Sequence, residues 1–193
     1  MTCVLRNKAA TNKEQQELQD AVYRSAKKLK QLTEDILDVT KIESQSSLQL
    51  HKEQFNLNEM ILNIIEESRE TTKMQLVSKE DIFLNADKSR ISQVISNLLN
   101  NAIKFTNKHG IIIITAEQKD SRVTVSVKDT GTGIDPDIMP RLFTKFATKS
   151  EKGTGLGLFI SKSIVEAHGG KIWAENNADG KGTTFYFNLP LSK

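Results

Sequence analysis

The sequence predicts a long amphipathic helix followed by an α+β domain, and three observations carry this prediction. An apolar stripe with helical spacing runs through residues 11–45, whereas shorter helix-like and strand-like patterns alternate from residue 51 onward. None of the ten glycines precedes Gly110, and nine lie at or beyond Gly131. Because glycine permits turns and close backbone approaches that a side chain would block, we expect a functional site in the last third. The 193 residues fit one to two domains, which we place at 1–50 and 51–193.

The first domain is predicted to be one long helix over residues 11–45. Thr11 and Glu14 form a capping-box pattern that predicts its start, and residues 3–8 are consistent with the end of a preceding helix. Its apolar positions follow alternating steps of four and three, with Ser25 filling one gap, as in a coiled coil or an antiparallel bundle. They are Leu18, Val22, Leu29, Leu32, Ile36 and Val39. We expect dimerisation through this stripe, with packing of the helix against its own domain as the alternative.

The second domain is predicted to mix helices and strands. Asp87 is a suitable N-cap for the helix with the most regular apolar stripe, which continues to Ile103. Further helices are predicted at about 57–70 and 155–167. Alternating apolar residues predict strands at 54–56, 111–117, 123–129, 171–175 and 183–188, with weaker candidates at 74–77 and 81–84. A loop with two prolines leads to about Gly153.

Composition excludes several classes of partner. The 27 basic and 24 acidic residues are interspersed, whereas nucleic-acid-binding proteins concentrate lysine and arginine in one patch, so we expect no nucleic-acid partner. The longest apolar run, Ile111 to Ile114, is far too short for a bilayer span, and the N-terminus lacks a secretory layout. We therefore expect a cytoplasmic fragment without membrane contact, although a full-length parent could be membrane-attached. A single cysteine excludes an internal disulfide.

One helix carries an unusual polar face. Asn97, Asn101 and Lys104 follow i, i+4, i+7 spacing, which places two amides and an ammonium along one side. An amide oxygen is a suitable ligand for Mg²⁺, and a lysine ammonium binds phosphate oxygens. A solvated helix surface is the alternative interpretation of this face.

Three glycine-rich strings complete the set of unusual patterns. Asp129-Thr130-Gly131-Thr132-Gly133-Ile134 ends a predicted strand, where the backbone can bend beneath a flat ligand and the carboxylate can accept from an exocyclic amine. Gly153-Thr154-Gly155-Leu156-Gly157 opens a predicted helix, where free amides form an anion site. The chain lacks the P-loop, the dinucleotide pattern and the eukaryotic-type kinase boxes. A third glycine string, Gly180 to Phe185, opens the last strand.

Together these strings make residues 51–193 similar to the ATP-binding domain of a sensor histidine kinase, in the GHKL superfamily. Residues 97–104 resemble its N box, 142–146 its F box, and 129–133, 153–157 and 180–184 its three glycine boxes. The resemblance implies the Bergerat fold, a two-layer α/β sandwich in which helices cover one face of a mixed, mostly antiparallel sheet. Residues 15–45 resemble the second helix of the dimerisation and phosphotransfer hairpin.

The resemblance also implies roles for individual residues. Asn101 would coordinate Mg²⁺ with Asn97 nearby, Lys104 would contact phosphate, and Asp129 would accept from the adenine amino group, supported by Thr183 or Thr184 directly or through water. A lid over 135–152, anchored by Phe143 and Phe146, would carry Lys149 to the γ-phosphate. The remaining pocket residues are expected to be Phe105, Gly131, Gly133, Ile134, Gly153, Thr154, Gly155, Leu156 and Gly157.

The implied function is that of a protein-histidine kinase with ATP and Mg²⁺ as cofactors and Asn101 and Lys104 as its catalytic residues. It would transfer the γ-phosphoryl group to a histidine, for relay to a response-regulator receiver domain, and it would form a homodimer through residues 15–45. The H box that carries the phosphoacceptor is absent, and His168 before Gly169-Gly170 is expected to be structural, so self-phosphorylation is not expected. A GHKL-type ATPase, which requires a glutamate where Asn97 stands, and a non-enzymatic nucleotide-binding or dimerising remnant are the alternatives.

Overall fold

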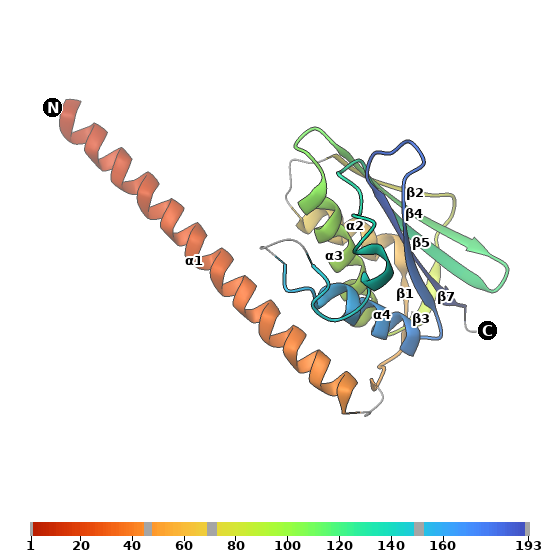
Figure 1. The fold of residues 1–193 in the computed structure, drawn as a ribbon. Coiled ribbons are helices and arrows are strands. Elements are labelled where there is room, and N and C mark those ends of the chain that lie inside the picture. Colours follow the sequence, from red (N-terminus) through yellow and green to blue (C-terminus); the bar gives the residue numbers. More distant parts are fainter. Residues whose placement is uncertain (1, 45–47, 69–72, 149–152, 192–193) are drawn as a thin grey trace. The chain divides into compact units, whose positions relative to one another are not determined.

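The computed structural model describes residues 2–44, 48–68, 73–148 and 153–191 (Figure 1). The chain divides into two compact units, Met1–Thr40 and Lys41–Lys193, and each is described here by itself. In the described residues, no helix is both long and apolar enough to cross a membrane.

The N-terminal unit is formed by helix α1, Thr2–Glu43, whose last residues belong to the second unit. It runs without interruption through Thr11, so the predicted start at that residue and the separate helical end at 3–8 are wrong. The reason is that no glycine or proline occurs between residues 2 and 43 to end a helix, and a capping pattern alone does not break one. Four members of the predicted stripe, Leu18, Val22, Leu29 and Ile36, are each more than half exposed.

The second unit is built on a five-stranded sheet in the order β2-β4-β5-β7-β6. Only the first pair is parallel, so the sheet is mixed and mostly antiparallel, as expected. The strands are β2 (Lys73–Ser78), β4 (Ile111–Lys119), β5 (Arg122–Asp129), β6 (Lys171–Asn176) and β7 (Thr183–Pro190). A separate antiparallel pair joins β1 (Glu53–Asn56) to β3 (Phe83–Ala86).

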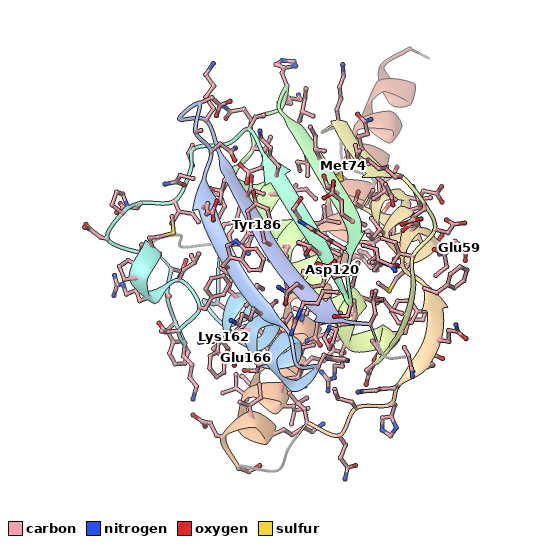
Figure 2. The ribbon with its side chains drawn as sticks, turned by 90° about the vertical axis from the view of Figure 1, so that its right-hand side faces the viewer. Glu59, Met74, Asp120, Lys162, Glu166 and Tyr186 are labelled. Carbon is pink, nitrogen blue, oxygen red and sulfur yellow. The ribbon has the colours of Figure 1, made fainter. Side chains whose placement is uncertain are left out.

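Helices cover one face of the sheet, which confirms the two-layer arrangement. They are α2 (Leu57–Glu67), α3 (Lys88–Phe105) and α4 (Gly157–Ala167), and a short 3₁₀ turn, η1, spans Met139–Arg141. Alternate strand residues such as Ile114, Val125 and Phe187 are fully buried together with Leu98 of α3 and Ile160 of α4. Figure 2 looks onto the open face, where Tyr186 lies. Its ring stacks on that of Trp173, with centroids 5.1 Å apart.

Several element boundaries differ from the predictions. Strand β3 begins at Phe83 rather than 81 and continues to Ala86, because the alternation of exposed and buried residues runs up to the cap of α3 at Asp87. Helix α4 begins at Gly157 rather than 155, since Gly155 has a φ of +70° and cannot join a right-handed helix. The predicted ends of the helices at 45 and 70 lie outside the described residues.

The N-cap of α2 at Asn56 and that of α3 at Asp87 each accept backbone N–H bonds.

Candidate functional site

The carboxylate of Asp129 lies at the end of β5 and is only 2% exposed. Its Oδ1 accepts hydrogen bonds from the backbone N–H groups of Gly131 (2.8 Å) and Thr183 (3.3 Å). Its Oδ2 has no hydrogen-bond partner among the described residues. One carboxylate oxygen is thus held by the protein, and the other can accept a hydrogen bond from a ligand.

Burial raises the pKa of Asp129, and the N–H bonds from Gly131 and Thr183 offset only part of that effect. A carboxylate kept out of water forms a stronger hydrogen bond with a neutral donor than an exposed one does. This environment suits recognition of an uncharged amine on a flat base.

Two glycines bring the segments around Asp129 into contact. A Cβ on Gly182 would lie 2.1 Å from the carbonyl oxygen of Asp129, and one on Gly131 would lie 2.3 Å from the carbonyl oxygen of Phe105. Neither space admits a side chain. The first glycine box therefore packs directly on the end of α3, and the third packs directly on the first.

Asn176 joins the segment after the first glycine box to the end of β6, and no sequence pattern singled it out. Its side chain accepts from the N–H of Ile134 (2.7 Å) and donates to the carbonyl of the same residue (2.8 Å). Gly133, at a φ of +78°, lies against this amide. Two hydrogen bonds between the Asn176 side-chain amide and the Ile134 backbone therefore hold Ile134 to the end of β6.

Asn177 was missed as well. Its Nδ2 donates to the carbonyl oxygens of Asp129 (2.8 Å) and Lys181 (2.6 Å), and its Oδ1 accepts from the Thr184 hydroxyl (2.7 Å). Consecutive asparagines before Asp179-Gly180 look like ordinary turn residues, so the only signal in the sequence was one that most hairpins share.

The polar face of α3 divides into two parts. The amide of Asn97 donates to the carbonyl oxygen of Gly157 (3.2 Å) and to the Ser161 hydroxyl (3.3 Å), so it joins α3 to the first turn of α4. The side chain of Asn101 has no hydrogen-bond partner in the described part of the chain. The ammonium of Lys104 lies 5.0 Å from the centre of the Phe105 ring.

The second glycine box forms the entry to α4. Gly155 faces the F box, because a Cβ there would lie 2.6 Å from Cα of Phe146, whose N–H donates to the Gly155 carbonyl (3.0 Å). The Thr154 hydroxyl accepts from the N–H of Leu156, and Gly153 precedes this turn. The first N–H groups of α4 have no intrahelical acceptors, which makes this end attractive to phosphate.

The F box is held differently from the expectation. Phe146 is 70% exposed and has a φ of +61°, so it does not anchor the segment by burial. Leu142 is the buried apolar side chain here, Phe143 is half-buried, and Lys145 lies over the ring of Phe159. The backbone bond to Gly155 is what fixes Phe146. Lys149, expected at the γ-phosphate, lies outside the described residues.

Helix α3 therefore connects the two groups of site residues. Its end contacts Gly131 beside Asp129, and Asn97, about 12 Å back along the axis, contacts the start of α4. Asn101 and Lys104 lie between these contacts. Among the described residues no cluster of three or more His, Cys, Asp or Glu side chains could hold a metal ion by itself.

Comparison with known proteins gives consistent matches. Residues 86–193 match the family described as histidine kinase-, DNA gyrase B-, and HSP90-like ATPase. The chain is 38% identical over 188 residues to the sensor protein KdpD of Clostridium acetobutylicum, covering 92% of this chain and 21% of that protein. It is 34% identical over 171 residues to the sensor protein kinase WalK of Staphylococcus aureus, covering 82% of this chain and 41% of that protein. The chain thus spans less than half the length of these relatives.

Two solved structures of one relative extend the match. The catalytic domain of histidine kinase ThkA superposes with a TM-score of 0.67 at 37% identity, covering 73% of this chain and 96% of that domain. The histidine kinase ThkA in complex with the response regulator protein TrrA superposes with a TM-score of 0.67 at 34% identity, covering 85% of this chain and 49% of that one.

Proposed function

The chain belongs to the histidine kinase-, DNA gyrase B-, and HSP90-like ATPase family, as the ATP-binding domain of a sensor histidine kinase, and on this premise we propose that it binds ATP with Mg²⁺ and donates the γ-phosphoryl group to a histidine. The acceptor histidine would be on a dimerisation domain. A response-regulator receiver domain would then take the phosphoryl group from that histidine.

The observation that carries the adenine part of the proposal is the divided carboxylate of Asp129. Its Oδ1 is occupied by two backbone N–H groups and its Oδ2 has no partner among the described residues, so an exocyclic amine is the group it would bind. The positions where Gly131 and Gly182 exclude a Cβ keep the surrounding backbone close to this carboxylate. Thr183 supports the contact through its backbone N–H.

The phosphate part of the proposal rests on α3 and α4. Lys104 would neutralise phosphate charge, and the first N–H groups of α4 would donate to phosphate oxygens. Asn101 would supply an amide oxygen to Mg²⁺, and the ion when bound would neutralise charge on the phosphates. Phosphoryl transfer requires mainly positioning and charge stabilisation from the protein, so no carboxylate base is needed here.

The amide at Asn97 favours transfer of the phosphoryl group to histidine over hydrolysis of ATP. An amide cannot take a proton from water, and this one already donates to Gly157 and Ser161. An ATPase that activates water from this position of the helix would need a carboxylate there.

The partners follow from α1 and from the relatives. The exposed stripe of α1 has the spacing of a helix that pairs with a second copy, which supports a homodimer. The ThkA structure with a response regulator supports a receiver domain as the partner in relay. This chain carries no H-box histidine, so we expect transfer only to an acceptor supplied separately.

The test is incubation of the chain with an acceptor-containing hairpin and γ-labelled ATP in the presence of Mg²⁺. Label on the acceptor histidine supports the proposal. Rapid release of labelled phosphate without labelled histidine would favour an ATPase, and nucleotide binding without either reaction would favour a non-enzymatic module. Asp129→Asn is the control, because it should remove labelling while the acceptor remains unchanged.

A further inference from the structure

The side chain of Asn177 contacts three segments that meet behind Asp129. Its amide donates to the carbonyl oxygen of Asp129 at the end of β5 and to that of Lys181 in the β6–β7 turn, and it accepts from Thr184 on β7. From this arrangement we propose that Asn177 is a positioning residue that orients Asp129 and so sets the preference for a 6-amino purine over a 6-oxo purine. The inference rests on the proposed adenine site.

The orientation of the Asn177 amide is determined by its partners. Two carbonyl oxygens lie within 2.8 Å of Nδ2, and a carbonyl oxygen cannot donate, so the NH₂ group must face them. Its Oδ1 then faces the buried Thr184 hydroxyl, which donates to it. Reversing the amide would place oxygen against two oxygens and lose both donated bonds.

The β6–β7 turn does not need this side chain in order to close. The backbone N–H of Asn177 donates to the Gly182 carbonyl (3.0 Å), and the N–H of Gly180 donates to the Asn177 carbonyl (2.9 Å). These two bonds define the turn through the main chain alone. The side-chain bond to Asp129 therefore does something further, which is to attach the turn to the end of β5.

This attachment bears on selectivity through the carboxylate of Asp129. The Oδ1 atom is held by N–H groups on either side, Gly131 in the first glycine box and Thr183 in the third. Asn177 holds the main chain of Asp129 itself. With both ends held, Oδ2 keeps one direction, and it accepts from a 6-amino group but repels a 6-oxo group.

Without the Asn177 amide, the Asp129 carbonyl loses its side-chain bond to the turn, and the carboxylate is held only through the N–H groups of Gly131 and Thr183. Hydrogen bonds weaken steeply when angle or distance departs from the preferred range, and a reoriented carboxylate can rotate away from a 6-oxo group. Affinity for the amino base should therefore fall while the penalty for the oxo base becomes smaller. A residue that only stabilised the fold would lower the folded fraction and leave the ratio of the two affinities unchanged.

The experiment compares the affinities of the full chain for ADP and for inosine diphosphate by calorimetry, in wild type and three variants. Asn177→Asp keeps the acceptor for Thr184 and removes both donated bonds. Thr184→Val removes the hydroxyl that donates to Oδ1 of Asn177. The matched control is Asn188→Asp, at the other end of β7, where Oδ1 accepts from Arg122 and from the N–H of Lys171, and these contacts survive the same change in charge.

We expect Asn177→Asp to weaken ADP binding about tenfold and to reduce the ADP preference by a similar factor. Thr184→Val should also reduce the preference for ADP over inosine diphosphate. It becomes the decisive variant if Asn177→Asp lacks a cooperative unfolding transition and is therefore not properly folded. Asn188→Asp should bind both nucleotides as wild type does. An undiminished ADP preference in the folded Asn177 or Thr184 variant overturns the inference. If the wild-type chain binds ADP and inosine diphosphate equally well, the assignment of the adenine site is overturned, and the role of Asn177 is overturned with it.

Discussion

The Nε2 atom of His168 accepts a hydrogen bond from the backbone N–H of Asp87 at 3.1 Å, joining the end of α4 to the start of α3. The other ring nitrogen, Nδ1, lies 2.8 Å from the carbonyl oxygen of Ile164, to which it donates in the neutral tautomer. Burial lowers the pKa of His168, although the Ile164 carbonyl and the Asp87 charge act in the opposite direction. His168 is thus a structural residue, as expected from its place at a helix end.

The first prediction concerns stability against pH. The folded state disfavours protonation of His168, so below the ordinary pKa of 6.5 the unfolded chain binds more protons than the folded one. The contribution of this residue is complete above pH 6.5 and decreases as the pH falls through that value. His168→Phe should flatten the dependence below about pH 6.5 and, because the Asp87 N–H loses its acceptor, cost about 1–3 kcal/mol at pH 8.

Chemical denaturation at several pH values measures both effects. His109→Phe, in an exposed turn, is the control and should leave the free energy of unfolding at pH 8 unchanged. An undiminished pH dependence in His168→Phe would contradict the assignment of this slope to His168.

The second prediction separates steric contact from backbone strain at two glycines of one turn. Gly180 and Gly182 have φ values of +71° and +78°, so alanine is strained at both. A Cβ at Gly180 meets nothing within 4 Å, whereas one at Gly182 meets the Asp129 carbonyl at 2.1 Å. Gly180→Ala should cost about 1 kcal/mol, and Gly182→Ala should cost at least twice as much and also lower nucleotide affinity. If thermal unfolding shows that Gly180→Ala and Gly182→Ala lose the same stability, Gly182 does not pack closely on Asp129.

The third prediction applies the same comparison to the second glycine box. Gly155 has a φ of +70°, and a Cβ there would lie 2.6 Å from the Phe146 backbone, whereas the nearest neighbour of a Cβ at Gly157 is the Asn97 amide, at an ordinary 3.5 Å. Gly155→Ala should displace the F box and lower stability by about 2 kcal/mol or more. Gly157→Ala, at a helix start, should fold as stably as wild type. Hydrogen exchange at the N–H of Phe146 reports the displacement, and continued protection in Gly155→Ala would argue against it.

The fourth prediction distinguishes the base from the metal. Asp129→Asn loses a charged acceptor and should weaken ADP binding about 100-fold with or without Mg²⁺. Asn101→Ala should leave the affinity for metal-free ADP unchanged and remove mainly the increase that Mg²⁺ produces. Calorimetry with and without Mg²⁺ measures both. Unchanged affinity in both variants would reject the assignment of the pocket.

The fifth prediction concerns the stripe of α1. Leu29→Lys combined with Ile36→Lys places charges on the predicted seam and should raise the dimer dissociation constant at least about tenfold. Leu37→Lys, at an exposed apolar position outside the four-three spacing, is the control. Light scattering over a range of concentrations gives the masses. If the seam and control variants dissociate alike, dimerisation through this stripe is contradicted.

The sequence predicted those parts of the fold that have local signals. The cap and stripe of α3, the start of α2 at Leu57 and the end of β5 at Asp129 depend on neighbouring residues, and all three were located correctly. The predicted helix start at Thr11 was wrong because a capping pattern marks a helix start only where the residues before it are not helical. The resemblance to the F box implied that Phe146 is an anchor, yet neither a motif nor hydrophobicity reveals which apolar residues stay exposed.

The parts that could not be predicted are contacts between distant segments. Asn177 meets the carbonyl of Asp129 across 48 positions of sequence, and no local pattern of residue types records such a pair. The glycine strings indicated that close approaches would occur, but not that Gly182 would meet Asp129 or Gly131 would meet Phe105. Such pairings emerge only when the sheet order is known.

The stacked pair on the open face of the sheet has a practical consequence. Trp173 is the single tryptophan of the chain, and its stacking partner Tyr186 is on the neighbouring strand of the hairpin that also carries Gly182 and Thr184. The intrinsic fluorescence of this one indole therefore reports whether β6 and β7 remain paired, without any attached dye. Each substitution in that hairpin can be sorted by its emission spectrum into those that separate the strands and those that alter only the ligand side.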